Sequence, residues 1–262
     1  MTKTPIISVT DTDRAVASED PVSTTSQAPV STTAQAYDTV RRAIINAELS
    51  PGTYVSQVQL AAQLNISRTP LREALRRLQS EGLLEGDFNR RLRVAPLSVD
   101  DLEQVAAMRI MLESFGVEAS VPKLDSERLD RAAEALRQMD RTLSDPESYD
   151  AFHVPHRIFH TALFSAVGPR MRSQLEELWD HAERYRAYYR QSASDALALA
   201  SIAHDEHASI MRSAWEGDAV RCGRLIAAHL ARTALTTLAS LDPTHDPMMI
   251  REAISRATYS RD

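Results

Sequence analysis

Apolar residues recur at helical spacing through most of the chain, and one such helix carries arginines on its other side. Leu71, Ala74, Leu75 and Leu78 follow the i, i+3, i+4, i+7 pattern of a helix that buries one face. Such a helix is either a solvated surface helix or one whose N-terminal end contacts DNA bases and phosphates. The residues that would make this contact are Ser67, Arg68, Thr69, Arg72 and Arg76.

The neighbouring pattern makes this helix the third in a small domain. Residues 37–47 and 57–64 show helical periodicity, and a turn follows the first of them. After the third helix, two short apolar segments within residues 83–94 flank a basic turn that contains Arg90 and Arg91. Three helices and a β-hairpin predict a winged helix-turn-helix.

From Ser98 onward the pattern is helical throughout. Ser98 and Asp101 form a capping box that starts a new helix, and prolines and Gly217 separate the helices that follow. We expect an all-α bundle of six or seven helices joined to the winged helix, so the fold class is mainly α. The expected helices span 99–120, 126–142, 150–166, 170–191, 195–215 and 219–240, with a candidate short helix at 247–257.

These patterns divide the chain into four parts. The N-terminal segment is rich in Ser, Thr, Ala and Pro and predicts a disordered tail, because it cannot bury enough apolar surface to offset its chain entropy. The expected parts are the tail at 1–34, the winged helix at 35–95, the helical domain at 98–240 and a C-terminal tail at 241–262.

Charge is distributed unevenly over the 262 residues. Residues 36–95 hold nine Arg against six Asp and Glu, a net charge of +3, whereas residues 96–262 have a net charge of −7 from nineteen basic and twenty-six acidic residues. A basic segment joined to an acidic domain favours a DNA-binding role for the former. No stretch approaches ~18 consecutive apolar residues, so no membrane insertion is indicated. The one cysteine, Cys222, fits a reducing cytoplasm.

One motif makes the DNA-binding interpretation specific. Residues 67–75 read S-R-T-P-L-R-E-A-L, and with the L-S-P-G at 49–52 and the E-G-L at 81–83 they resemble the N-terminal domain of GntR-family bacterial transcription regulators. The resemblance implies that Arg68 and Arg72 contact bases or phosphates of double-stranded operator DNA and that Ser67 and Thr69 bond phosphates. It also implies that Arg90 and Arg91 approach the minor groove.

The chain departs from the GntR pattern at three positions. Arg91 stands where the family usually has Gly, so the wing turn is expected to differ in shape, because Arg disfavours a positive φ. Ala47 replaces another frequent Gly and is expected to firm up the end of the first helix. Gln57 stands where an acidic residue is frequent at the start of the second helix.

Four histidines in the second half are candidate metal ligands. His156 and His160 are four residues apart, so both lie on one face of a helix, and His207 and His229 lie on two later helices that can converge with it. Imidazole is a common ligand of Zn, Ni, Cu and Fe. The alternative is a chance pair of histidines and two distant residues that never meet.

Residues 98–240 resemble the FCD effector-binding domain of the FadR-like branch of the GntR family. The segments H-R-I-F-H, E-H-A-S-I and G-D followed by H-L carry the resemblance, and three family histidines map onto His160, His207 and His229. His156 stands where the family has Asp. Replacing a carboxylate by imidazole predicts a divalent metal closer to Zn or Ni than to Mn. The alternative is a metal-free site in which protonated histidines hold an anion.

Arg109 lies among apolar residues, so a buried position would require an anionic partner. The partner is either Glu113, four residues on, or a ligand. In the FCD domain the corresponding Arg reaches into the effector pocket, which implies that Arg109 clamps a small carboxylate metabolite. Arg184, Arg186 and Tyr188 are further candidates for the lining of that pocket.

Together these features predict a DNA-binding transcriptional regulator that acts as a homodimer and is not an enzyme. The resemblance implies a repressor, because repression is the usual behaviour of the family. Two alternatives remain. One is a helical metal-dependent hydrolase that uses the His cluster, although the cluster lacks an evident general base. The other is a regulator for which the metal itself is the signal.

Overall fold

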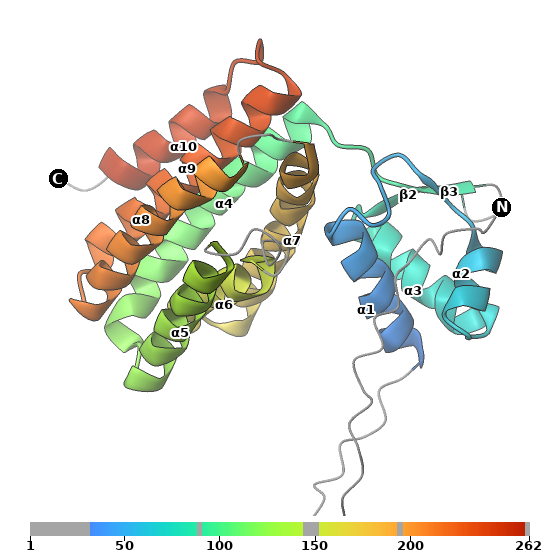
Figure 1. Ribbon diagram of the computed structural model, residues 1–262, viewed down its shortest axis with the longest axis horizontal. Coiled ribbons are helices and arrows are strands. Elements are labelled where there is room, and N and C mark those ends of the chain that lie inside the picture. Colours follow the sequence, from blue (N-terminus) through green and yellow to red (C-terminus); the bar gives the residue numbers. More distant parts are fainter. Residues whose placement is uncertain (1–31, 88–90, 144–151, 193–195, 260–262) are drawn as a thin grey trace, which may run out of the picture. The chain divides into compact units, whose positions relative to one another are not determined.

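The structure is a computed structural model, and it describes residues 32–87, 91–143, 152–192 and 196–259. The chain divides into two compact units, Met1–Leu97 and Ser98–Asp262. Each unit is built around its own set of helices (Figure 1). No helix in the described ranges is long and apolar enough to cross a membrane.

In its described residues, the first unit contains three helices and a small antiparallel sheet. Its strand order is β1-β3-β2, in which Leu84 pairs with Val94 and Tyr54 with Arg93. The strand β1 was not expected from the sequence, because two residues are too few for an alternating pattern to be visible. The elements are α1 (Thr32–Ile45), β1 (Tyr54–Val55), α2 (Gln57–Gln63), α3 (Arg68–Ser80), β2 (Leu84–Asp87) and β3 (Arg91–Val94).

The predicted apolar stripe of α3 forms the centre of the core of this unit. Leu71, Leu75 and Leu78 are fully buried, together with Val40 and Ile44 of α1. The polar side of α3 is thereby turned outward. The N-cap prediction for α2 is confirmed, since the Ser56 hydroxyl accepts a hydrogen bond from the Gln59 amide at 3.3 Å.

The first helix is longer than the sequence predicts. α1 begins at Thr32 and not at Tyr37, so it takes in the last three residues of the expected tail; residues 1–31 lie outside the described part of the chain. Ala36 is buried, and the Tyr37 hydroxyl donates to the Glu81 carboxylate at 2.8 Å. These tertiary contacts stabilise a turn of helix that the Ser- and Thr-rich sequence does not indicate.

The effect expected of Ala47 was wrong. α1 ends at Ile45, and Ala47 adopts the left-handed conformation with a φ of +59°, which Gly adopts without strain and Ala does not. Asn65, between α2 and α3, has a φ of +51°, a conformation that Asn tolerates better than most residues.

The wing also differs from expectation. Arg91 begins strand β3, where it pairs with Asp87, and does not lie in the turn. In the described part of the wing the positive φ, +111°, belongs to Gly86. Arg91 is therefore not forced into a conformation that it disfavours. Arg90 lies outside the described residues.

The second unit is an all-α bundle, and its predicted helix boundaries agree with the structure to within a few residues. The Ser98 hydroxyl accepts from the Asp101 amide at 3.3 Å, as the capping box predicts. The helices are α4 (Val99–Ser120), a 3-10 turn (Val121–Lys123), α5 (Ser126–Leu143), α6 (His153–Leu163), α7 (Pro169–Ser192), α8 (Ala196–Trp215), α9 (Ala219–Leu241) and α10 (Met248–Tyr259).

The long helix α4 lies at the centre of this bundle and packs against α7, α9 and α10 (Figure 1). The candidate short helix at 247–257 is present as α10, and it is packed into the bundle. α10 buries Ile250 and Ala253, and the buried Glu103 of α4 accepts from the Met249 amide at 2.6 Å. Because a helix N-terminus favours an anion, Glu103 stabilises α10 as a regular part of the bundle.

Candidate metal centre and DNA-contacting surface

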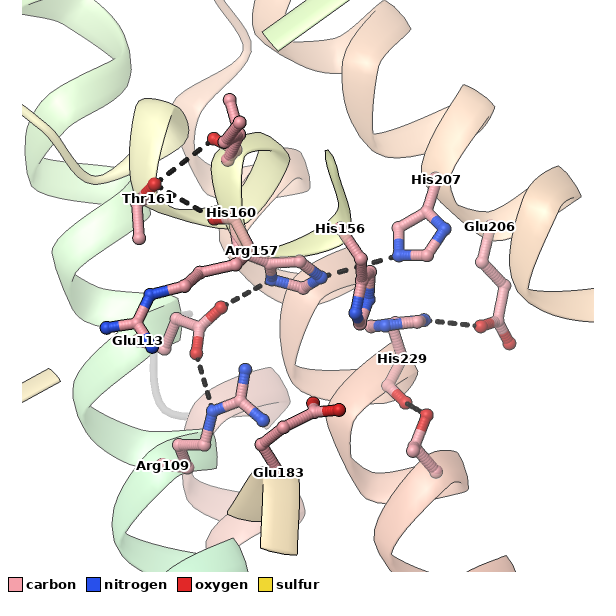
Figure 2. Close-up of polar contacts among 12 residues, drawn as sticks. Arg109, Glu113, His156, Arg157, His160, Thr161, Glu183, Glu206, His207 and His229 are labelled. Carbon is pink, nitrogen blue, oxygen red and sulfur yellow. Dashed lines mark hydrogen bonds and ion pairs between the residues drawn. The ribbon is translucent and has the colours of Figure 1, made fainter. Parts of the chain in front are cut away.

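Three helices bring the four predicted histidines together inside the bundle (Figure 2). His156 and His160 project from α6, His207 from α8 and His229 from α9, and all four are buried. One ring nitrogen from each lies within 4.8 Å of those of the other three. The Nε2 atoms of His160 and His207 are 3.4 Å apart. The packing therefore excludes the alternative of histidines that never meet.

Two of the imidazoles are oriented by carboxylates that the sequence analysis did not assign to them. His160 Nδ1 lies 2.6 Å from Glu113 Oε1, and His229 Nδ1 lies 2.7 Å from Glu206 Oε2 (Figure 2). A carboxylate accepts the Nδ1 proton, so Nε2 of each ring keeps its lone pair. The buried Nε2 of His229 has no hydrogen-bond partner. Both rings thus direct the lone pair of Nε2 toward the cluster, where that of His160 faces Nε2 of His207.

Burial lowers the pKa of His156, His160, His207 and His229. For His229 the shift remains downward although Glu206 raises the pKa. A neutral imidazole is the form that binds a metal. The lowered pKa values argue against the alternative in which protonated histidines hold an anion.

His156 has a cationic neighbour instead of a carboxylate. Arg186 Nη1 of α7 lies 3.1 Å from His156 Nδ1, and the same guanidinium donates to Glu183 through Nη2. Burial lowers the pKa of Arg186 to about 10, and its guanidinium carbon lies 4.7 Å from the centre of the Trp179 ring. His156 is therefore chemically distinct from the other three.

Arg109 is buried and paired within the chain. Its Nε donates to Glu113 Oε2 at 2.9 Å, and its guanidinium carbon lies 4.2 Å from the centre of the Trp179 ring. This is the intramolecular ion pair that the sequence left open. The Nη2 atom of Arg109 nevertheless remains buried without a hydrogen-bond partner. Glu113 therefore joins the arginine to the histidine cluster.

A small cavity of about 20 Å³ adjoins Arg109. Of the further residues expected to line it, Arg186 does so, whereas Arg184 and Tyr188 do not; Tyr185 takes part instead. The contribution of α7 to this cavity is thus made by Ala182, Tyr185 and Arg186. The remaining lining is mostly apolar and comes from α4, α7 and α9: Leu102, Ala106, Ala182, Leu230, Thr233, Ala234 and Thr237.

The predicted DNA-contacting residues of α3 share an exposed surface. Ser67 occupies the N-cap position, but its side chain makes no capping hydrogen bond. On the wing, the exposed Arg91 lies 5.4 Å from the centre of the Tyr54 ring of β1. Hydroxyls and guanidinium groups therefore cover the N-terminal end and outer side of the helix: Ser67, Arg68, Thr69, Arg72 and Arg76.

Comparison with known protein families agrees with both halves of this description. Residues 32–94 match the family described as "Bacterial regulatory proteins, gntR family". The chain belongs to the GntR family. Residues 104–232 match the FCD domain. As a GntR regulator with an FCD domain, the protein is a DNA-binding transcriptional regulator and not an enzyme.

Individual relatives support this assignment. The chain is 30% identical over 200 residues to the uncharacterized HTH-type transcriptional regulator BphR of Paraburkholderia xenovorans, covering 74% of this chain and 80% of BphR. It is 25% identical over 199 residues to the HTH-type transcriptional repressor GlaR of Escherichia coli, covering 74% of this chain and 90% of GlaR. The solved structure of E. coli McbR/YncC shares the fold, with a TM-score of 0.73 and 21% identity over 81% of this chain and 100% of that chain.

Proposed function

We propose that this GntR regulator is a repressor that binds a pseudo-palindromic operator as a homodimer and releases it when a small organic acid binds beside a metal in the helical unit. The direction of regulation is supported by relatives named as repressors, such as GlaR and the gluconate operon transcriptional repressor of Bacillus subtilis. The observation that carries the regulatory part is the buried cluster of four histidines with carboxylates behind two of them.

In this proposal the exposed side of α3 enters the major groove. Arg68, Arg72 and Arg76 meet base edges or phosphates, and Ser67 and Thr69 bond phosphates. Arg91, with Arg90 beyond the described residues, approaches the minor groove. The argument rests on the exposure of these side chains and on the position of the hydroxyls at a helix N-terminus, where backbone N–H groups favour phosphate.

The residues of the cluster fit a divalent metal ion. The ring nitrogens are neutral and close together, and one of them, Nε2 of His229, is buried with no partner. Since none of the four candidate ligands is a carboxylate, the set suits Zn or Ni better than Mn. A bound metal would supply open coordination positions that a carboxylate can occupy. The chain's own contribution is to orient His160 through Glu113 and His229 through Glu206.

The effector proposed for this site is a small carboxylate metabolite. Arg109 has an unpartnered Nη2 at a buried position, and burying an unpaired N–H of a guanidinium costs free energy that an anionic ligand would recover. The adjacent cavity of about 20 Å³ holds no more than a water-sized group. Effector binding therefore requires the side chains around Arg109 to move, which is how a ligand can change the state of the protein.

Elemental analysis of untagged protein after incubation with Zn(II), Ni(II) or Mn(II) tests the metal centre. We expect one divalent ion per chain, with Zn or Ni retained in preference to Mn. His160→Ala and His207→Ala should lose the ion, whereas His204→Ala should keep it, because His204 is half-exposed and pairs with Asp140. A wild-type protein that stays metal-free under these conditions would falsify the proposed centre.

Operator affinity distinguishes the organic-acid effector from the alternative in which metal alone is the signal. Fluorescence anisotropy on DNA from upstream of the gene is measured while metal and a panel of small organic acids are titrated separately. We expect an acid to weaken binding to DNA by the metal-loaded wild type and to have a reduced effect on Arg109→Gln. A response to metal alone, with none to any acid, would favour the metal sensor.

A further inference from the structure

The hydrogen bond between Arg186 and His156 has a consequence for the metal centre. An Arg guanidinium can only donate, so a ring nitrogen bonded to it must use its lone pair to accept. With Arg186 Nη1 lying 3.1 Å from His156 Nδ1, the lone pair of Nδ1 is engaged. A neutral imidazole then carries its proton on Nε2. In this state neither nitrogen of His156 can bind a metal.

The other tautomer does not remove the conflict. If Nε2 of His156 bound a metal, Nδ1 would carry the proton and would present an N–H to the N–H of Arg186. If Nδ1 bound a metal, Arg186 would have to leave that nitrogen. Coordination by His156 and its hydrogen bond with Arg186 are therefore mutually exclusive for either ring nitrogen.

The three other histidines have no such conflict. Nδ1 of His160 and Nδ1 of His229 are bonded to carboxylates, and their Nε2 atoms are left for a metal. Nε2 of His207 lies 3.4 Å from that of His160 and donates to its lone pair, so a metal on both would require the His207 proton to move to Nδ1. Arg186 is meanwhile anchored independently of His156, because Nη2 donates to Glu183 and that carboxylate is also paired with Arg190 at 2.8 Å.

We propose that Arg186 competes with the metal ion for His156, so that the chain holds the ion with three imidazoles, those of His160, His207 and His229, while Arg186 stays on His156. This inference rests on the proposed metal centre and specifies its ligands. Arg186 then acts as a positioning residue that limits metal affinity. It does so by holding His156 away from the ion.

Zinc binding by metal-stripped full-length protein tests the proposal, with affinity measured by competition against a chelator and ligand number by X-ray absorption. Wild type should show three imidazoles. Arg186→Met should show four and bind zinc about 10- to 100-fold more tightly, the range by which residues that orient ligands change affinity. His156→Ala alone should change the zinc affinity of the wild type less than about threefold. When it is combined with Arg186→Met, it should remove the whole gain in affinity, as expected for two coupled residues.

A control and a second readout separate the possible outcomes. Arg190→Met removes a nearby cation that touches Glu183 but not His156, and should leave the ligand number at three. Four imidazoles in wild type, or a loss with His156→Ala as large as that with His207→Ala, would overturn the competition while leaving the metal centre intact. Absence of zinc from wild type and every variant would overturn both. The His156→Ala comparison needs no change at Arg186, so it decides the question even if Arg186→Met does not fold.

Discussion

At the scale of single residues, the shape of the wing depends on Gly86. This residue has a φ of +111°, and a Cβ added to it would lie 2.3 Å from the carbonyl oxygen of Arg91. Gly52, in the turn before β1, has a φ of +77° but nothing within 4 Å of an added Cβ. An L-residue would therefore be strained at either position, but only at Gly86 would its Cβ also clash.

We expect Gly86→Ala to destabilise the protein more than Gly52→Ala does. The left-handed backbone alone costs an L-residue about 1–2 kcal/mol, which applies to both variants. At Gly86 the contact with backbone atoms cannot be relieved by rotating a side chain, so at least about 1 kcal/mol more is expected. Calorimetric melting of the full chain measures the difference. Equal melting temperatures for the two variants would contradict the steric argument.

At the scale of elements, α3 has a buried apolar side that packs in the core and an exposed side that carries the predicted DNA contacts. Leu71, Leu75 and Leu78 hold the helix in the core, so the exposed Arg72 on the other side can be changed at little cost to folding. This separation makes DNA contact and stability independently measurable.

Arg72→Ala should weaken binding to operator DNA by about 10- to 100-fold, as expected for an arginine that contacts a base, with an unchanged melting temperature. Arg212→Ala removes an exposed arginine of the helical unit and serves as the matched control. Anisotropy or footprinting at physiological salt gives the readout. If the Arg72→Ala footprint equals that of wild type, α3 does not read the DNA as proposed.

The helix α4 presents an apolar side to solvent in the single chain. Met108, Met111 and Phe115 are 49%, 48% and 51% exposed, and they line a hollow together with Leu178 of α7. Such a patch favours a contact between copies of the chain, because in a two-fold symmetric dimer the same surface is used by both partners.

The proposed homodimer should therefore dissociate in Phe115→Glu, because this change places two like charges in a symmetric apolar contact. Analytical ultracentrifugation at several concentrations follows the change. Met248→Glu alters an equally exposed apolar residue, 66% exposed on α10, and should leave the dimer intact. A dimer that persists in Phe115→Glu would place the interface elsewhere.

At the scale of the whole molecule, the helical unit encloses ionisable groups whose pKa values are lowered by burial. In the metal-free protein the four clustered imidazoles stay neutral when folded, whereas those of the unfolded chain gain protons below a pH of about 6.5. The unfolded state then binds more protons. The free energy of unfolding therefore has its full value above that pH and falls as the pH drops below it.

We expect the free energy of unfolding of the metal-stripped helical unit to fall by about 3 kcal/mol or more between pH 7 and pH 5.5, since each imidazole contributes up to about 1.4 kcal/mol per pH unit. Urea unfolding followed by the fluorescence of the buried Trp179 reports on this unit. His160→Gln should reduce the dependence on pH, because it removes one of the buried imidazoles. The same unfolding midpoint at both pH values would show that the cluster does not remain neutral.

Much of this organisation was accessible from the sequence, because it depends on local periodicity and on residue types at fixed offsets. The apolar stripe of α3, the cap at Ser98 and the helix boundaries of the bundle follow from interactions within a few residues. The four histidines were identified from their spacing and their resemblance to a family pattern. His156 in place of an acidic residue was also visible in the sequence, although its hydrogen bond with Arg186 was not.

The remaining features depend on residues far apart in the sequence, and only the tertiary structure decided them. The tertiary fold brings Glu113 of α4 to His160 of α6, and Arg186 of α7 to His156 of α6. Such pairs form because a buried charge or ring N–H must find a partner among whichever elements surround it, and the sequence does not state which elements those are. The sequence thus determined which four histidines could serve a metal, and the tertiary structure decided that one of them is engaged by an arginine.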